Sequence, residues 1–153
     1  MTTPSPDPEP DLIHVIYASA ATRALDRGEV LGLLDVARRV NAGLGVTGIL
    51  LYIDDSFFQV LEGSVAVVTS LYDRIGRDDR HRKVLKLIQE PIAARSFADW
   101  SMGYAALSRS DLETIPGMND LFRTKTTFLD LGDGRVRSLL AAFAEGRWRA
   151  RVL

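Results

Sequence analysis

The chain of 153 residues contains no cysteine. Disulfides, thiol nucleophiles and cysteine-bound metals are therefore excluded, and the composition fits a cytoplasmic protein. The two histidines, His14 and His81, lie far apart in the sequence and match no metal-ligand spacing. No paired carboxylates and no nucleophile–base set stand out either. A metalloenzyme or a hydrolase is therefore not expected.

An excess of charge of one sign is also missing. With 19 Lys and Arg against 20 Asp and Glu, the net charge is −1, and the basic residues are scattered. Such a chain has no electrostatic surface for nucleic acid. No apolar run approaches membrane-spanning length, and the first residues lack the basic and apolar regions of a signal peptide. We therefore expect one globular domain with no nucleic-acid or membrane partner.

The most informative stretch is the apolar segment VTGILLYIDDSFFQVLEG at residues 46–63. It predicts two strands joined by a turn at 54–56, and both strands are apolar on both faces, as in the middle of a covered sheet. In the second strand Gln59 alternates with Phe57 and Leu61, which places its amide on an apolar face. A buried amide without a partner costs about 1–3 kcal/mol. We therefore expect Gln59 to have a specific hydrogen-bond partner.

The other elements follow from hydrophobic spacing and helix caps. Residues 1–11 alternate prolines with acidic residues, which predicts a disordered tail. Asp26 followed by Glu29 resembles a helix N-cap with a reciprocal carboxylate, and we expect this helix to end at 41–43. Ser64 can cap a second helix that ends within 76–83. The predicted strands are 12–19, which should be central, 46–52, 57–63, 84–88 and about 100–107.

This β-α-β-β-α-β-β order is the ferredoxin-like α+β arrangement with one added strand, both helices lying on one sheet face. The other face needs cover. After a short helix at 110–113, a further helix is expected from Asp133 to Gly146, with an apolar stripe at 136, 139, 140 and 143. This C-terminal helical extension, residues 108–153, would cover the second sheet face or form a subunit interface.

Several polar or aromatic side chains occupy apolar positions, and each alone has a simple structural explanation. Tyr17 can be a core tyrosine with a satisfied hydroxyl, and Asn41 can end a helix. Gln59 can satisfy a bulge or a helix end. Trp100 and Met102 can simply fill the core. None of these residues indicates a function by itself.

Together with their flanking residues they resemble the BLUF family of blue-light sensors that use FAD. The resemblance covers about residues 12–107 and includes Asn41 at the end of the first helix. Several motifs in the same order make it specific. The other matching pieces are IYAS at 16–19, VTGILLY at 46–52, FFQVLEG at 57–63, IGRDDRH at 75–81 and EPIAARSFADWSMGY at 90–104.

The resemblance implies a flavin ring held between the two helices. Leu33 and Ile75 would be its aliphatic walls, since a flat apolar ring favours such a lining. Asn41 would meet the pyrimidine edge, where an amide offers both a donor and an acceptor. Arg80 would lie near the same edge and His81 beside it, although this charged turn can also be a solvated surface. Family members often have a polar residue one position before Asn41, but this chain has valine there. Arg38 or Arg39 could substitute for the phosphate or ribose contact expected at that position.

Tyr17 and Gln59 would form the photoswitch. The resemblance implies that light moves an electron and a proton from Tyr17 to the flavin and back, leaving the Gln59 amide rotated or tautomerised. The product is a slightly red-shifted oxidised flavin. Trp100 and Met102, which should share a face of the fifth strand, would relay the change.

We therefore expect a small stand-alone cytoplasmic photoreceptor and not an enzyme. Its output would pass to an unknown downstream signalling protein or through self-association into a homo-oligomer. A small ferredoxin-like flavin enzyme is one alternative. The other is a cofactor-free interaction module in which Tyr17 and Gln59 simply bond to each other.

Overall fold

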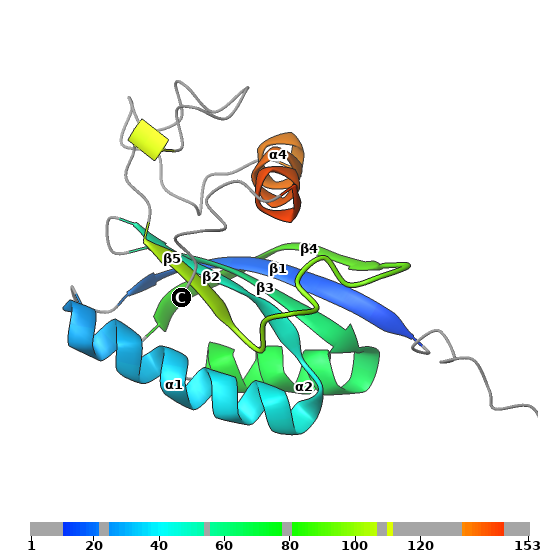
Figure 1. Cartoon of the computed structure of the whole chain (residues 1–153), viewed down its shortest axis with the longest axis horizontal. Helices are drawn as coiled ribbons and strands as arrows, with labels where there is room; N and C mark the ends of the chain where they lie inside the picture. Colours follow the sequence, from blue (N-terminus) through cyan, green and yellow to red (C-terminus); the bar gives the residue numbers. More distant parts are fainter. Residues whose placement is uncertain are drawn as a thin grey trace, which may run out of the picture.

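The computed structural model describes residues 11–21, 25–53, 56–77, 81–106, 110–111 and 133–145. A five-stranded sheet has the order β4-β1-β3-β2-β5 (Figure 1). Neighbouring strands are antiparallel except β2 and β5, which are parallel. The predicted α+β ferredoxin-like fold is confirmed. The elements are β1 Leu12–Ala21, α1 Arg27–Leu44, β2 Thr47–Ile53, β3 Ser56–Ser64, α2 Val65–Gly76, β4 His81–Pro91, β5 Gly103–Ala106 and α4 Asp133–Ala144.

The hairpin of β2 and β3 forms as predicted, with β3 in the middle of the sheet. All of β3 except its last residue, Ser64, is buried, since both faces of the sheet are covered. Ser56 was predicted to lie in the turn, but it already pairs with Ile53. The two residues between them lie outside the described part of the chain. The strand predicted to be central, β1, lies between β3 and β4, while β4 and β5 form the sheet edges.

Both ends of α1 follow from specific residues. The side chain of Asp26 accepts a hydrogen bond from the Glu29 N–H at 2.8 Å, and Glu29 Oε1 accepts from the Asp26 N–H at 3.4 Å. This confirms the predicted capping box. The prediction that the helix ends at 41–43 was wrong, because α1 runs to Leu44 and Gly45 provides the left-handed cap with φ of +69°. Asn41 therefore lies inside the last turn.

Helices cover both sheet faces (Figure 1). On β1, Val15 and Tyr17 belong to the core under α1 and α2, whereas Ile16 and Ala18 belong to the core under α4. The predicted placement of α1 and α2 on one face and of the C-terminal helix on the other is confirmed. No helix among the described residues has the length and apolarity to cross a membrane.

An ion pair between Glu90 of β4 and Arg137 of α4 accompanies the apolar docking of α4. Arg137 donates two hydrogen bonds to the Glu90 carboxylate at 3.0 and 2.9 Å, and His14 Nε2 lies 2.9 Å from Glu90 Oε1. The hydrogen bonds from Arg137, followed by that from His14, lower the pKa of Glu90 to about 2. The carboxylate therefore stays ionised at neutral pH. The predicted helix end at Gly146 and, apart from residue 11, the predicted tail lie outside the described residues.

Candidate functional site

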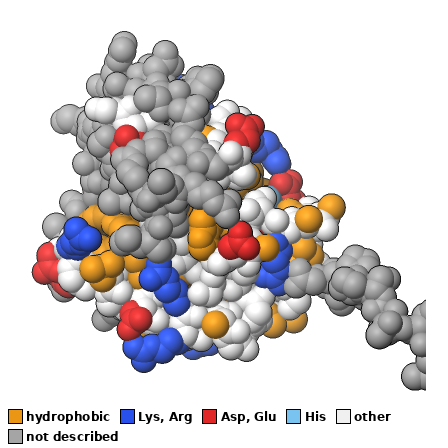
Figure 2. Space-filling view, in the orientation of Figure 1, with side chains coloured by type: hydrophobic (Ala, Val, Ile, Leu, Met, Phe, Trp, Pro, Cys, Tyr) orange, Lys and Arg blue, Asp and Glu red, His pale blue; other side chains and the backbone are white. Residues whose placement is uncertain are grey.

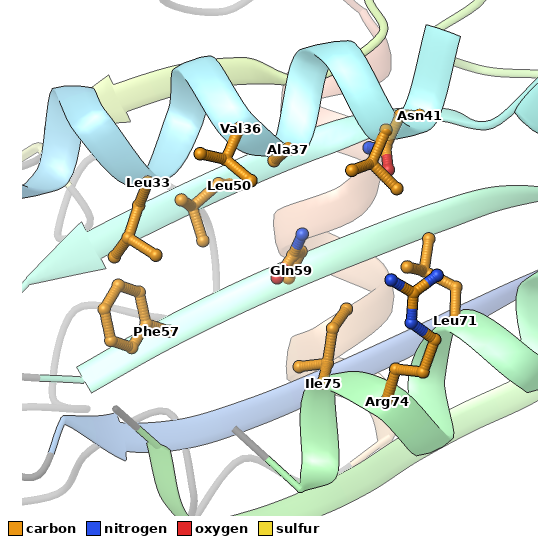
Figure 3. Close-up of a pocket in the computed structure, with 11 residues that line it drawn as sticks. Leu33, Val36, Ala37, Asn41, Leu50, Phe57, Gln59, Leu71, Arg74 and Ile75 are labelled. Carbon is orange, nitrogen blue, oxygen red and sulfur yellow. The ribbon is translucent and has the colours of Figure 1, made fainter. Parts of the chain in front are cut away.

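A cavity of about 230 Å³ lies between α1 and α2 above the sheet. Figure 3 shows helix side chains approaching it from two sides and Gln59 lying between them on its strand. Apart from Asn41, Gln59 and Arg74, its lining is apolar. The lining residues are Leu33, Val36, Ala37, Val40 and Asn41 from α1, Leu50, Phe57 and Gln59 from the sheet, and Leu71, Arg74 and Ile75 from α2.

Gln59 is hydrogen-bonded at both ends of its buried amide. It stands opposite Tyr17 in the register of β1 and β3, and the Tyr17 hydroxyl donates to Gln59 Oε1. Gln59 Nε2 donates to Met102 Sδ at 3.6 Å. Tyr17 is fully buried and Gln59 is 7% exposed. The amide thus connects a phenol and a thioether at the floor of the cavity, which confirms that it has a specific partner.

Met102 and Trp100 lie on different sides of the sheet, so the prediction that they share a face was wrong. Both precede β5, in an irregular segment to which the two-residue alternation of a strand does not apply. Met102 is buried in the core under α1 and α2. Trp100 packs against the core under α4, with its ring stacked on Phe97 at a centroid distance of 6.0 Å. Of the two, Met102 is the one bonded to Gln59.

Two side chains of α1 hold the segment that carries Met102. The buried Asn41 donates from Nδ2 to the Ser101 carbonyl at 2.7 Å. Arg38 Nε donates to the Met102 carbonyl at 2.8 Å. Asn41 is therefore more than a helix end, because its side chain links α1 to the backbone beside the Gln59 partner.

A buried carboxylate fixes the start of the same segment. Glu62 has no exposed surface, and its two oxygens accept hydrogen bonds from Thr47 Oγ1, Ser96 N and Phe97 N at 2.9, 2.6 and 3.0 Å. Arg95 donates to Thr47 Oγ1 at 2.8 Å and to two carbonyls, those of Glu62 at 3.2 Å and of the α1 cap residue at 2.8 Å. Sequence reasoning missed Glu62, although its position on a buried strand carried the same signal as that of Gln59.

Glu62→Gln is expected to destabilise the domain by about 1–3 kcal/mol. The glutamine amide group would place donors against N–H or hydroxyl donors that now meet carboxylate oxygens. Chemical denaturation measures the change, and Glu145→Gln, at an exposed position directly after α4, is the matched control. If the two variants unfolded at the same denaturant concentration, the Glu62 carboxylate would not be organising this segment.

Of the other described residues predicted to contact the flavin, only some line the cavity. Leu33 and Ile75 line the cavity from opposite helices. Arg80 and the side chain of His81 lie outside the described residues. Arg39 pairs with Asp35 at 2.6 Å, and its side chain is 76% exposed. Sequence reasoning missed Arg74, which lines the cavity from α2.

The lining fits a flavin. Its aliphatic walls suit a flat apolar ring, and the Gln59 and Asn41 amides can meet the hydrogen-bonding edge of such a ring. Among the described residues, no group of three or more His, Asp or Glu side chains could hold a metal ion.

The family model for BLUF domains, described as sensors of blue light using FAD, matches residues 12–103. The chain belongs to the BLUF family. This BLUF domain resembles photoactivated adenylate cyclase subunit beta of Euglena longa, with 35% identity over 111 residues. The match covers 72% of this chain and 13% of that protein. The chain therefore spans only a small part of the length of this curated relative.

Two solved structures share the fold of this BLUF domain. The photo-activated state of BlsA matches with a TM-score of 0.77 at 28% identity, covering 87% of this chain and 94% of that chain. The dark state of BlrB, a BLUF protein, matches with a TM-score of 0.72 at 34% identity, covering 88% and 96%. The chain is thus a flavin-binding sensor of blue light.

Proposed function

We propose that this BLUF domain binds oxidised FAD in the cavity between α1 and α2 and converts blue light into a rearrangement of the Gln59 amide. The hydrogen-bonded chain from Tyr17 through Gln59 to Met102 carries this proposal, since Gln59 lines the cavity. Leu33 and Ile75 are the proposed walls for the ring. Asn41, Arg80 and His81 are the proposed contacts at its polar edge.

Tyr17 is the proposed electron and proton donor. A bound flavin supplies, on absorbing blue light, a strong oxidant. The Tyr17 hydroxyl already donates to Gln59 Oε1, so a path for its proton exists before illumination. Because the phenol is fully buried, water does not compete for that proton.

Gln59 is the proposed switch. Its contact to Met102 Sδ is a weak hydrogen bond, since a thioether sulfur is a poor acceptor. Rotation of the amide would turn Oε1 toward that sulfur, which has no proton to donate, and the contact to Met102 would be lost. Tautomerisation would also change which atoms of Gln59 donate. Both routes alter the hydrogen bonds offered to the cavity, and rotation also releases Met102.

The colour of the purified protein separates this proposal from the two alternatives. Yellow protein whose flavin band shifts to the red under blue light and returns in the dark supports the sensor. Colourless protein that takes up no added FAD would contradict the sensor and favour the cofactor-free interaction module. Yellow protein that bleaches without the shift would favour the small flavin enzyme.

Met102→Leu is expected to slow dark recovery by about two- to tenfold. The bond to Met102 re-forms as Gln59 returns to its dark arrangement, so its loss raises the barrier of that step by up to roughly 0.5–1.5 kcal/mol, and 1.36 kcal/mol corresponds to a tenfold change in rate. Trp100→Phe, in the core under α4, should change the recovery rate by less than about twofold. Recovery of the flavin absorbance after a blue pulse measures both. The opposite order of effects would mean that Trp100 carries the signal instead.

The proposed output is a change in binding to a signalling protein or in self-association, without catalysis by residues 12–107. The Euglena relative is named as a cyclase, and the match covers only 13% of it. The extension at 108–153 is the proposed transmitting part, since α4 packs on the sheet face opposite the cavity.

A further inference from the structure

The cavity opens to solvent between α1 and α2, and the two sides of its mouth differ in chemistry. On α1 the mouth is apolar, with Val36 52% exposed and the half-buried Val40 beside it. On α2 the exposed Arg74 lines it. Figure 3 shows the Arg74 side chain extending from α2 toward the end of the cavity that holds Leu71 and Asn41. Arg74 is the one charged residue among those described as lining the cavity.

The two arginines in the C-terminal half of α1 are engaged elsewhere. Arg38 donates to the Met102 carbonyl, and Arg39 pairs with Asp35 on the outer surface of the helix. Among the described residues, the Arg74 side chain has no hydrogen-bond or ion-pair partner that would hold it away from the cavity. A guanidinium at the mouth of an apolar cavity, without a partner among the described residues, is suited to a phosphate.

The covalent structure of flavins indicates on which side of the bound ring the phosphate would lie. N5 and N10 lie on opposite edges of the central ring, and N10 carries the ribityl chain, which bears a phosphate in FMN and FAD. If the N5 edge meets Gln59 at the floor, as the proposed function requires, the chain leaves toward the mouth. Riboflavin, FMN and FAD share the ring and the ribityl chain, and only FMN and FAD carry phosphate.

We propose that Arg74 binds the phosphate of the flavin nucleotide and makes the site selective for FMN and FAD over riboflavin. The proposal rests on the proposed function and adds a residue that neither the motifs nor the helical stripe pointed to. It replaces the expectation that Arg38 or Arg39 serves the cofactor tail. Arg80, proposed for the ring edge, would act on all three flavins alike.

The test compares dissociation constants of riboflavin, FMN and FAD for the wild type, Arg74→Gln and Arg39→Gln, by flavin fluorescence quenching of the apoprotein. Arg74→Gln should weaken FMN and FAD binding by about tenfold and riboflavin binding by less than about twofold. Arg39→Gln changes the net charge equally and should leave all three constants unchanged. Arg74→Lys should retain part of the phosphate preference, because it keeps the charge without the planar fork.

Equal weakening of all three flavins by Arg74→Gln would overturn the proposal, because it would place Arg74 at the ring or in the fold. Unchanged affinity for FMN and FAD in that variant would overturn it too. A wild-type protein that binds none of the three flavins would instead defeat the proposed function itself.

Discussion

Gln59→Leu is expected to abolish the light-induced red shift while leaving flavin bound. Leucine has a similar size but can neither accept the Tyr17 proton nor donate to Met102 Sδ, so both bonds of the dark state disappear. The buried Tyr17 hydroxyl would lose its partner at Gln59, at a cost of up to about 1–3 kcal/mol of stability. Flavin binding should persist, because the apolar walls of the cavity are unchanged.

Gln89→Leu is the matched control for this variant. Gln89 lies exposed on β4, where its Oε1 accepts a hydrogen bond from Lys86 at 2.6 Å. The light-minus-dark absorption spectrum measures the red shift in both variants, and Gln89→Leu should retain it. A normal red shift in Gln59→Leu would show that the switch resides elsewhere.

Tyr17→Phe is expected to remove the shift as completely as Gln59→Leu, for a different reason. The ring and its packing remain, but the phenolic proton and the easily oxidised hydroxyl are gone. Excited flavin would then decay without the reversible step, so its fluorescence should rise as the shift disappears. Time-resolved fluorescence together with the difference spectrum measures both effects.

Tyr72→Phe provides the control for the tyrosine. Its ring lies edge-on to Tyr17 at a centroid distance of 5.4 Å, and burial raises the pKa of the Tyr72 hydroxyl. Tyr72 is therefore a second protonated phenol, and its ring contacts that of Tyr17. If Tyr72→Phe removed the shift and Tyr17→Phe did not, the assignment of the donor would be reversed.

The strands and their faces could be predicted because side chains alternate between the two faces of a strand, and this pattern can be read from a few neighbouring residues. It placed Tyr17 and Gln59 on apolar faces, and the structure confirms both as buried. Their direct opposition could not be predicted, since it depends on the register between β1 and β3, which are far apart in the sequence. The family resemblance, and not the spacing, suggested that the two side chains act together.

The placement of Trp100 and Met102 failed for a physical reason. Alternation assigns faces only within a strand, and residues 92–102 form none. Their course is set by long-range hydrogen bonds to Glu62 and from Asn41. Such contacts leave no periodic trace in the sequence.

Arg74 escaped prediction because it stands at the edge of a helical stripe. Leu71 and Ile75 mark the apolar face of α2, and an arginine beside them resembles an ordinary solvated residue. Only the position of Arg74 beside the cavity between α1 and α2 distinguishes it from such a solvated arginine.

Photoswitching in this domain is proposed to change one amide, that of Gln59, and the chain is well suited to the direct observation of that change. It contains two glutamines, Gln59 and Gln89. Labelling the glutamine side-chain amides with ¹⁵N therefore yields two sets of NMR signals, one from the cavity floor and one from the exposed face of β4. Blue light should shift the Gln59 signals, which should return in the dark at the rate of the flavin band, while those of Gln89 stay fixed. A red shift of the flavin band with unchanged Gln59 signals would contradict the account.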